Sequence, residues 1–551
     1  MLHDKMKKLF AQHPAGLPYL FLTELWERFG YYLMIGIFVL YMEDTVAGGL
    51  GLASASSTDI FGTFIALNYL TPFIGGMLAD RLLGYRRAVI IGGILMGLGY
   101  CCLAIQGMQF FWFAIFLMVL GNGFFKPNIS TLLGNLYNSP EYKAQKDIGY
   151  NIFYMGINIG AFVCNFFAAW ARNNIGWWAA FLTAGIGMFI GVAVFIFGNK
   201  HYAHVDMKKE PQSGEQNVLV VLATVLIPAA ITAYIGYKIP GNLLGSDSTD
   251  AFIFGCLPIV AFFLNTLRTA AAHEKRPIAA LLAIYAVVIV FWAVFKQNGT
   301  ALTKWAELYT DREATPTMSA CFTPFKLLQE IDNTKKLYPK YDASFRAPKN
   351  AEGKVIKDTT SHPYFINAPN KIPPTGSKLK LYSTELFQSI NPFWVIVLTP
   401  LVIWFFGLLR KRGKEPTTAT KMGAGLLITS LSSVVMVFAV WACHNGMEKS
   451  SLWWLWGTYG VVTIGELCLS PMGLSLASKL APARIAALMM GGWQLATAIG
   501  NKLSGVLASL WDTYDDKANF FWLNSALTAA AAVAIFAMIR WLNSVIKEYA
   551  E

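Results

Sequence analysis

Residues 24–32 read Glu-Leu-Trp-Glu-Arg-Phe-Gly-Tyr-Tyr and place two carboxylates and a guanidinium inside the first long apolar run of the chain. On a helix, Glu24, Glu27, Arg28 and Tyr31 share one face, because side chains three and four positions apart lie above one another. Each charge at the centre of a bilayer costs about 2.5–3.5 kcal/mol on insertion scales, so this group needs compensation. A helix-packing pair accounts for Arg28 and one glutamate only. We therefore interpret this face as part of an ion or proton pathway.

The rest of the chain is dominated by apolar runs of about twenty residues, the length that spans the hydrocarbon core of a membrane. Of the 551 residues, 55% are apolar and 14% are charged, whereas soluble proteins carry about a quarter charged residues. The net charge of +12 raises the question of nucleic-acid binding, but Lys and Arg lie mostly in short loops between the runs. There they report topology. We predict an all-α polytopic membrane protein that binds no nucleic acid.

The apolar runs predict fourteen spans, arranged as six, an inserted pair and six more. They cover residues 19–42, 57–80, 86–107, 110–134, 149–171, 177–198, 218–238, 251–269, 278–299, 389–409, 423–443, 453–476, 484–509 and 519–542. We expect an N-terminal six-helix bundle over 1–200 and a C-terminal one over 276–551. A cytoplasmic linker and the two inserted helices occupy 201–275.

The positions of Lys and Arg predict which side each connection faces. One set of short connections, which includes both ends of the chain, holds 23 Lys and Arg, and the opposite set holds four. Because cytoplasmic loops carry the excess of positive charge, we expect both termini to be cytoplasmic. Residues 300–388 then form a long outer loop between bundle helices 7 and 8. Their aromatic and proline content favours a small packed extracytoplasmic cap.

The connection between the second and third spans combines glycine and charge in a spacing that an ordinary basic loop does not need. Residues 75–87 read Gly-Gly-Met-Leu-Ala-Asp-Arg-Leu-Leu-Gly-Tyr-Arg-Arg. Glycine lets helices approach closely, and Asp80 and Arg81 are placed to pair across a junction that opens and closes. The loop resembles the signature of the major facilitator superfamily, whose members rock two six-helix halves about a central site. We predict a cytoplasmic gate at Asp80 and Arg81.

Two polar residues lie deep in later spans of the first half. Lys126 is a cation in span 110–134, and Pro127 beside it frees backbone carbonyls and favours a local kink. Asn158 supplies an uncharged donor and acceptor in span 149–171. A buried asparagine serves helix–helix contacts about as often as ligand binding.

Five short motifs in order give these residues a family context. They are Glu-x-x-Glu-Arg-Phe-x-Tyr-Tyr at 24–32, Phe-Tyr-x-x-Ile-Asn-x-Gly at 153–160, Gly-Glu-Leu-Cys-Leu-Ser-Pro at 465–471, Lys-Leu-Ala-Pro at 479–482 and Met-Met-Gly-Gly-Trp at 489–493. The chain resembles the proton-dependent oligopeptide transporter (POT/PTR) family of the major facilitator superfamily over essentially every span. The inserted pair is similar to the two extra helices of bacterial members.

The resemblance implies a role for each matching residue. Glu24, Glu27 and Arg28 correspond to the proton-coupling cluster. Lys126 corresponds to the partner of the substrate carboxylate, and Glu466 to the partner of its amino group. The residues that correspond to peptide-backbone contacts are Tyr31, Tyr32, Tyr69, Asn158 and Asn391, and those that correspond to apolar pocket walls are Trp292 and Trp493.

The resemblance also implies a function. It implies a secondary symporter of the bacterial inner membrane that uses inward proton flow to import di- and tripeptides by alternating access. It implies a monomer in the lipid bilayer that needs no cofactor. An enzyme or ATP-driven pump is disfavoured, because the sequence has no Gly-x-x-x-x-Gly-Lys-Ser/Thr phosphate loop and no His-Glu-x-x-His metal motif.

Two residues depart from the family pattern. Ile35 stands where the family's first helix usually carries an arginine, and Lys296 stands where its seventh helix usually carries an acidic residue. The family's outer gate pair therefore cannot form here. We hypothesise that Lys296 either pairs with a glutamate of the first helix or binds a substrate carboxylate, which shifts preference toward acidic peptides or another anionic compound.

Two alternatives to peptide import stay open. The same scaffold can carry nitrate, an organic anion or a modified amino acid, and the altered residues 35 and 296 keep this open. A non-transporting peptide sensor, in which the 300–388 segment binds a partner, is less consistent with the sequence. Loss of the coupling carboxylates would indicate a sensor, and Glu24 and Glu27 are present.

Overall fold

A computed structural model describes residues 13–142, 145–206, 218–342, 344–348, 350, 355–481 and 486–549. Within them, a long helix lies over each predicted span. The first six are α2 (Leu17–Glu43), α3 (Ser54–Leu78), α4 (Tyr85–Leu103), α5 (Met108–Leu136), α6 (Lys146–Asn174) and α7 (Trp177–Phe197). The inserted pair is α8 (Val218–Lys238) and α9 (Asp247–Thr269). The last six are α10 (Ala272–Phe295), α13 (Ile390–Lys411), α14 (Thr418–Ala442), α15 (Leu452–Leu480), α16 (Ala486–Ser509) and α17 (Lys517–Tyr549). The predicted all-α class is confirmed.

The apolar length of these helices supports a membrane protein. In the described part of the chain, nine helices are long and apolar enough to cross a membrane. The helix α2 falls outside that set, because Glu24, Glu27 and Arg28 lower its mean hydropathy. Residues 24–28, which hold these three charges, are thus the least apolar part of α2.

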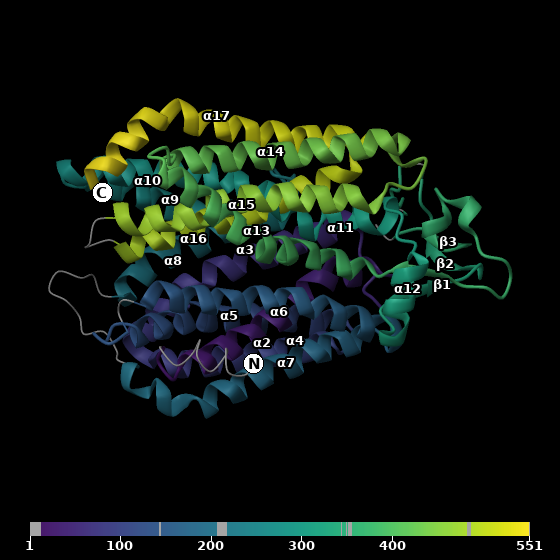
Figure 1. Ribbon diagram of the computed structural model, residues 1–551, viewed down its shortest axis with the longest axis horizontal. Helices are drawn as coiled ribbons and strands as arrows, with labels where there is room; N and C mark the ends of the chain where they lie inside the picture. Colours follow the sequence, from purple (N-terminus) through teal and green to yellow (C-terminus); the bar gives the residue numbers. More distant parts are fainter. Residues whose placement is uncertain are drawn as a thin grey trace.

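The helices gather into two groups that lie one above the other in Figure 1. In one group α2 packs on α6 and α7, and α5 packs on α3 and α4, around a shared apolar core. In the other, α14 packs on α15 and α17, and α10 packs on α16 and α17, around two further apolar clusters. The groups meet mainly where α3 lies against α16 and where α6 lies against α13. Residues far apart in sequence therefore face one another along this junction.

Glycine permits the closest helix approach in the first group. A Cβ atom on Gly75 would lie 2.0 Å from the carbonyl oxygen of Gly123. The helices α3 and α5 therefore touch backbone to backbone at this point, immediately before the loop 79–83. That loop continues α3 as a π-helical turn, Ala79–Leu83.

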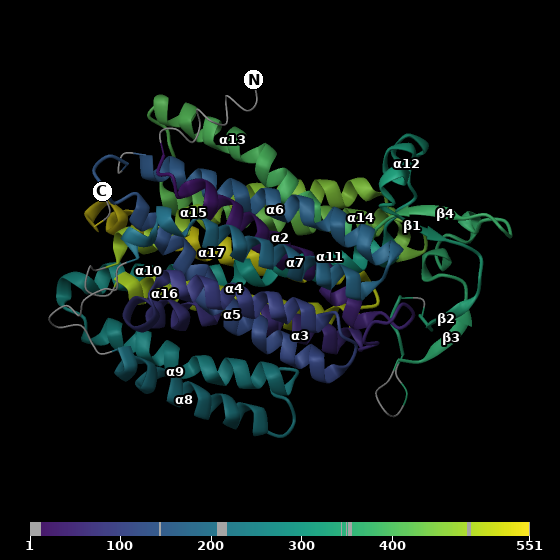
Figure 2. The same cartoon turned by 90° about the horizontal axis from the view of Figure 1, so that it is seen from below.

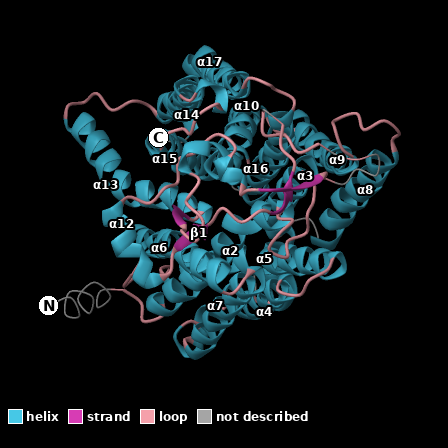
Figure 3. Cartoon of the chain, turned by 90° about the vertical axis from the view of Figure 1, so that its right-hand side faces the viewer, coloured by secondary structure: helices cyan, strands magenta, loops and turns pink. Residues whose placement is uncertain are grey.

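The inserted pair and α13 lie at the periphery. The helices α8 and α9 pack on each other along the lower edge of Figure 2. Both contact α3, and α9 also contacts α16. Figure 3 shows α13 set apart from the rest of the second group, on the opposite side of the molecule from α8. Trp404 and Ile403 of α13 are exposed, as expected of side chains that face lipid.

The seventh bundle helix continues past its predicted end at residue 299. A 3₁₀ turn, Lys296–Gly299, leads into α11 (Ala301–Lys304) and a π turn, Trp305–Tyr309. Trp305 and Tyr309 are buried in an apolar cluster of the second group. Polar residues from Gln297 to Lys304 interrupt the apolar run in the sequence. The sequence therefore did not predict that the helix continues beyond residue 299.

Beyond Tyr309 the chain folds into a small cap, defined here as residues 310–383, at the right of Figure 1. It contains α12 (Pro316–Phe322) and two antiparallel strand pairs. The strand β1 (Leu328–Ile331) pairs with β4 (Leu379–Tyr382), with Leu328 opposite Tyr382, and β2 (Lys336–Pro339) pairs with β3 (Lys357–Thr360). Ile331, Leu381, Tyr364, Phe365 and Ala368 form its own apolar cluster. The C-terminus lies at the far end of the molecule from the cap (Figure 1).

Candidate functional site

The charged residues of α2 form a buried, mutually paired cluster. Arg28 donates from Nη2 to Glu27 Oε1 at 2.6 Å and from Nε to Glu27 Oε2. Its Nε also lies 3.4 Å from Glu24 Oε1. All three side chains are at most 6% exposed. A two-point pairing of guanidinium with carboxylate is the strong geometry for an ion pair, so Arg28 is held mainly by Glu27 and more weakly by Glu24.

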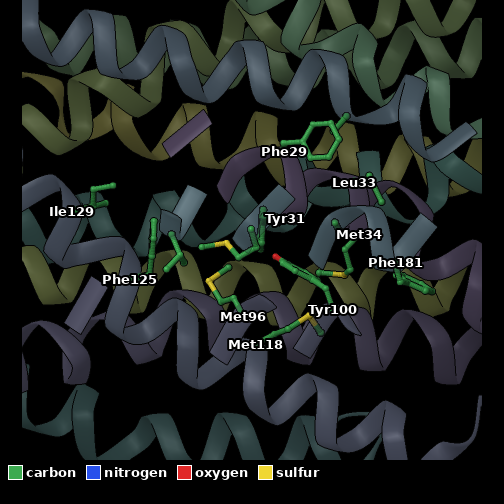
Figure 4. Close-up of a cluster of buried hydrophobic side chains, with 14 of the residues drawn as sticks. Phe29, Tyr31, Leu33, Met34, Met96, Tyr100, Met118, Phe125, Ile129 and Phe181 are labelled. Carbon is green, nitrogen blue, oxygen red and sulfur yellow. The ribbon is translucent and has the colours of Figure 1, made fainter. Parts of the chain in front are cut away.

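The remaining face of α2 is packed into the apolar core, which fixes the orientation of the cluster. Figure 4 shows Phe29, Leu33 and Met34 of α2 with Met96 and Tyr100 of α4. Tyr31, predicted to contact peptide, belongs to the same core and is 7% exposed. The Arg28 guanidinium lies 4.9 Å from the centre of the Tyr31 ring.

A chain of cations and aromatic rings connects the two helix groups. Lys126 Nζ of α5 lies 4.0 Å from the centre of the Tyr69 ring of α3. The Tyr69 ring lies 6.4 Å from that of Trp292 of α10, and Lys296 Nζ lies 5.5 Å from the Trp292 ring. Cations over aromatic faces are attracted by the ring quadrupole. The four predicted site residues are thus brought together across the junction of the two groups.

Glu466 of α15 stands on the other side of this junction. Asn391 of α13 donates from Nδ2 to Glu466 Oε2 at 3.2 Å and to Thr463 Oγ1 at 2.9 Å. Glu466 interacts electrostatically with Lys296 and Tyr69. Asn391, predicted as a peptide contact, orients this carboxylate.

Lys296 makes no ion pair with a glutamate of α2 among the residues that the structure describes. Lys296 interacts electrostatically with Glu466 and Tyr69 instead. Ile35 packs against the apolar core of the first group. The first of the two hypotheses for Lys296 is therefore not realised in this conformation.

Three further predicted residues lie near the site in different surroundings. Tyr32 stacks edge-to-face on Tyr31 with ring centres 5.4 Å apart. Asn158 donates to the Tyr154 carbonyl of its own helix at 3.0 Å. Trp493 is buried against Tyr285, with ring centres 6.2 Å apart, inside the second group. The role of Trp493 as an apolar pocket wall stays a prediction.

The predicted cytoplasmic gate falls where side chains are not described. Asp80 and Arg81 lie in the turn Ala79–Leu83, whose backbone is described, and their side chains lie outside the described part of the structure.

Two polar contacts at the cap end of the molecule join the two groups and were missed from the sequence. Lys304 Nζ, after α10, lies 3.3 Å from Glu43 Oε1 at the end of α2. Arg172 Nη1 of α6 donates to Glu385 Oε1 at 2.8 Å. Charges at helix ends are common, so single-sequence patterns gave no signal for these partners.

Tyr154 is a further neighbour of the site that was not among the predicted site residues. It lies in the motif 153–160, one turn before Asn158, and interacts electrostatically with Glu466 and Tyr32. Its position i−4 to Asn158 was the available signal.

The arrangement supports binding of a small dipolar molecule and movement of a proton. Lys126 and Glu466 offer a cation and an anion from different groups. The cluster of α2 offers two carboxylates that compete for one guanidinium. Lys126 interacts electrostatically with Glu24 and Glu27, so charge near Lys126 affects the cluster.

Known proteins match most of the chain. A model of the POT family matches residues 86–323 and 380–523. The di-/tripeptide transporter of Lactococcus lactis subsp. lactis is 30% identical over 92% of this chain and 92% of its own length. The peptide transporter YePEPT of Yersinia enterocolitica is 30% identical over 91% of this chain and 88% of its own.

Solved structures match as well. The crystal structure of a mutant of the peptide transporter POT with alafosfalin superposes with a TM-score of 0.74 at 28% identity, over 97% of this chain and 96% of that one. A POT family transporter in complex with 5-aminolevulinic acid gives 0.74 at 24% identity, over 96% and 97%.

Proposed function

The chain belongs to the POT family, and from this membership we propose that it is a proton-coupled symporter that imports di- and tripeptides by alternating access. It is a transporter and not an enzyme. The observation that carries the proposal is the chain Lys126–Tyr69–Trp292–Lys296, which lies across the junction between the paired cluster of α2 and Glu466.

The charges of the proposed site suit a zwitterion. Glu24, Glu27 and Glu466 are balanced by Arg28, Lys126 and Lys296, so a peptide with one ammonium and one carboxylate adds no net charge. In our proposal the peptide carboxylate binds Lys126 and its ammonium binds Glu466. A proton is then the only net charge that enters with the substrate.

The geometry of the cluster suggests where the proton acts. Glu24 makes a single, longer contact with Arg28, whereas Glu27 holds it at two points. Protonating Glu24 therefore sacrifices less pairing than protonating Glu27. We propose that a proton on Glu24 leaves Arg28 to Glu27 alone, and that a peptide carboxylate at Lys126 favours this state by withdrawing the lysine charge from the glutamates.

The moving parts in this proposal are the two bundles. Residues 1–200 and 276–551 rock about the site, and 201–275 links them. The excess of Lys and Arg in one set of short loops supports cytoplasmic termini and an extracytoplasmic cap. The proposed setting is a bacterial inner membrane, in which the chain acts as a monomer.

The decisive experiment is uptake of labelled dialanine into proteoliposomes with an imposed pH gradient. The proposal predicts accumulation above the equilibrium level when the outside is more acidic, and its loss when the gradient is collapsed. Uptake no higher than in empty vesicles, together with robust uptake of nitrate or an organic anion, contradicts peptide transport and supports the other substrate class.

A second candidate concerns substrate preference and rests on Lys296. This cation has no ion-pair partner among the described residues and lies beside Trp292, next to the proposed peptide position. We propose that Lys296 binds a second carboxylate, so that acidic peptides or other anionic compounds compete well with neutral peptides.

A further inference from the structure

A cavity of about 280 Å³ lies between the cap and the membrane-spanning body. Its floor comes from the end of α2 and its following loop, from Arg172 at the end of α6, and from residues 303–308 after α10. Its roof comes from β1 and β2 of the cap and from His362. The cavity is therefore bounded by both helix groups and the cap.

The walls combine apolar and charged side chains. Val39, Leu40, Leu308 and Ile331 provide apolar surface, and Tyr338 and Tyr341 provide aromatic surface. The charged lining residues are Glu43, Asp44, Arg172, Lys304, Glu307, Glu330, Asp332 and Lys336. The lining is thus about as polar as it is apolar, which suits a small charged ligand better than an apolar one.

Several of these charges are already satisfied. Asp44 accepts from the indole of Trp177 at 2.8 Å and from backbone N–H groups of its own loop. Glu330 pairs with Lys378 at 3.0 Å. Burial lowers the pKa of His362 to about 4, so its ring is neutral near pH 7. Glu330 and His362 thus offer the cavity no net charge, and the Asp44 carboxylate keeps its charge but is held by neutral donors.

The ion pair between Lys304 and Glu43 on the floor of the cavity is less completely satisfied than these groups. The separation of 3.3 Å is longer than the 2.7–2.9 Å of a strong charged hydrogen bond. Within the described structure, Glu43 Oε1 has no hydrogen-bond partner of good geometry. The Glu43 side chain is 28% exposed, whereas Lys304 is 7% exposed. Glu43 is thus a partly satisfied carboxylate that faces the cavity beside a cation.

We propose that this cavity is an outer receiving site for short zwitterionic peptides, which bind there before they reach the central site. The peptide ammonium binds Glu43, and the peptide carboxylate binds Lys304, with Lys336 facing it from the roof. Glu307 is already paired with Arg312 at 3.5 Å and accepts from the hydroxyl of Thr384. This inference rests on the proposed function for its direction and substrate class.

Peptide binding in this cavity also affects a contact that holds the two helix groups together at the cap end. Lys304 follows α10 and Glu43 ends α2, so their pair joins the two helix groups at the cap end. A peptide that supplies a carboxylate to Lys304 and an ammonium to Glu43 replaces each partner. The substrate itself then loosens the Lys304–Glu43 contact, whereas Lys304 still donates to Ser54 at the start of α3.

The test removes two side chains from the roof of the cavity and leaves Lys304 and Glu43 on its floor unchanged. Lys336 and Tyr338 line the cavity from β2, whereas Leu337 between them is 53% exposed and does not line it. The double variant Lys336→Ala/Tyr338→Ala is therefore the probe, and Leu337→Ala on the same strand is the matched control.

Binding of dialanine to the full chain in nanodiscs is measured by saturation-transfer NMR up to millimolar peptide. The background is Lys126→Ala/Glu466→Gln, which removes both proposed anchors of the central site. We expect saturable binding to persist in this background, to weaken about tenfold with the roof variant, and to be unchanged by Leu337→Ala. When the central site is unaltered, the roof variant should raise the KM of dialanine uptake, and Leu337→Ala should leave the KM as it is in the unaltered chain.

Two results would overturn the inference. One is the absence of saturable binding in the Lys126→Ala/Glu466→Gln background, and the other is equal binding by the roof variant and its control. Failure of the proposed function is a separate result, because it appears as absence of gradient-driven dialanine uptake by the unaltered chain.

Discussion

Lys502 Nζ lies 2.6 Å from Asp59 Oδ1, and this pair joins α16 of one helix group to α3 of the other. The lysine side chain is completely buried and also donates to Thr63 Oγ1 at 2.6 Å and Ser248 Oγ at 2.8 Å. Asp59 accepts from Ser246 Oγ at 2.8 Å as well. Because Ser246 and Ser248 begin α9, the inserted helix pair is tied to the junction between the two groups.

The burial of this pair predicts an asymmetric response to substitution. Asp59→Asn leaves a fully buried ammonium without its counter-ion and should destabilise the protein by about 3–5 kcal/mol. Lys502→Met leaves a carboxylate that is 22% exposed and keeps its serine donors, so its cost should be smaller. The double variant should recover much of the loss. Thermal unfolding in detergent measures this, and a larger loss for Lys502→Met than for Asp59→Asn would contradict it.

The paired cluster of α2 predicts separate effects on coupling and on binding. Glu24→Gln and Glu27→Gln should each abolish peptide accumulation driven by a pH gradient, because each removes a carboxylate that competes for Arg28. Substrate exchange in the absence of a gradient should persist for at least one of them, and we expect it for Glu24→Gln, which preserves the two-point Glu27–Arg28 pairing. Counterflow of labelled dialanine in proteoliposomes gives the exchange rate. If both variants accumulate peptide normally, the coupling assignment is wrong.

From the position of Lys296 we predict that the transporter prefers acidic peptides to neutral ones. In the unaltered chain an acidic dipeptide should inhibit dialanine uptake more strongly than a neutral dipeptide of similar size. Lys296→Ala should weaken inhibition by the acidic dipeptide several-fold, as expected for the loss of an ion pair of about 1 kcal/mol, and leave the neutral dipeptide unchanged. Equal inhibition by both peptides, before and after the substitution, would count against substrate binding by Lys296.

The helices and the charged cluster were predictable because their signals are local. Apolar runs of about twenty residues mark the spans, and Glu24, Glu27 and Arg28 are close enough in sequence to share a helix face. Roles for Lys126, Tyr69 and Trp292 were expected from the family resemblance, but their contacts with one another and with Lys296 are a result of packing. These residues are on different helices, yet each lies in a recognisable span.

Other features of the fold and the site depend on contacts between segments that are far apart in the sequence. Asp59 and Lys502 are 443 positions apart, and nothing in either segment indicates the other. The contact of Trp493 with Tyr285 inside the second group was not predictable, and the role of Trp493 as a pocket wall stays a prediction. The strand β3, Lys357–Thr360, has mostly exposed side chains and lacks the alternation that identifies a half-buried strand.

Lys449, between α14 and α15, predicts a pH dependence of stability. Its Nζ donates to the Leu308 carbonyl oxygen at 2.8 Å and lies 4.2 Å from the centre of the Tyr364 ring. Burial, with a further contribution from the nearby Arg312 cation, lowers the pKa of Lys449 from 10.5 to about 7. The unfolded chain therefore binds more protons than the folded one between these two values.

Stability should consequently rise with pH across that window, from about pH 7 to about pH 10. Below it both states carry the proton, so the cost of burying the charge is fully present. Lys449→Met removes this cost, so the melting temperature of the variant relative to the unaltered chain should be highest near pH 7 and fall as pH rises. Lys335→Met, at an exposed lysine of the cap, is the matched control and should show a constant difference. A constant difference for Lys449→Met would mean that the lysine is charged in the folded protein throughout the range.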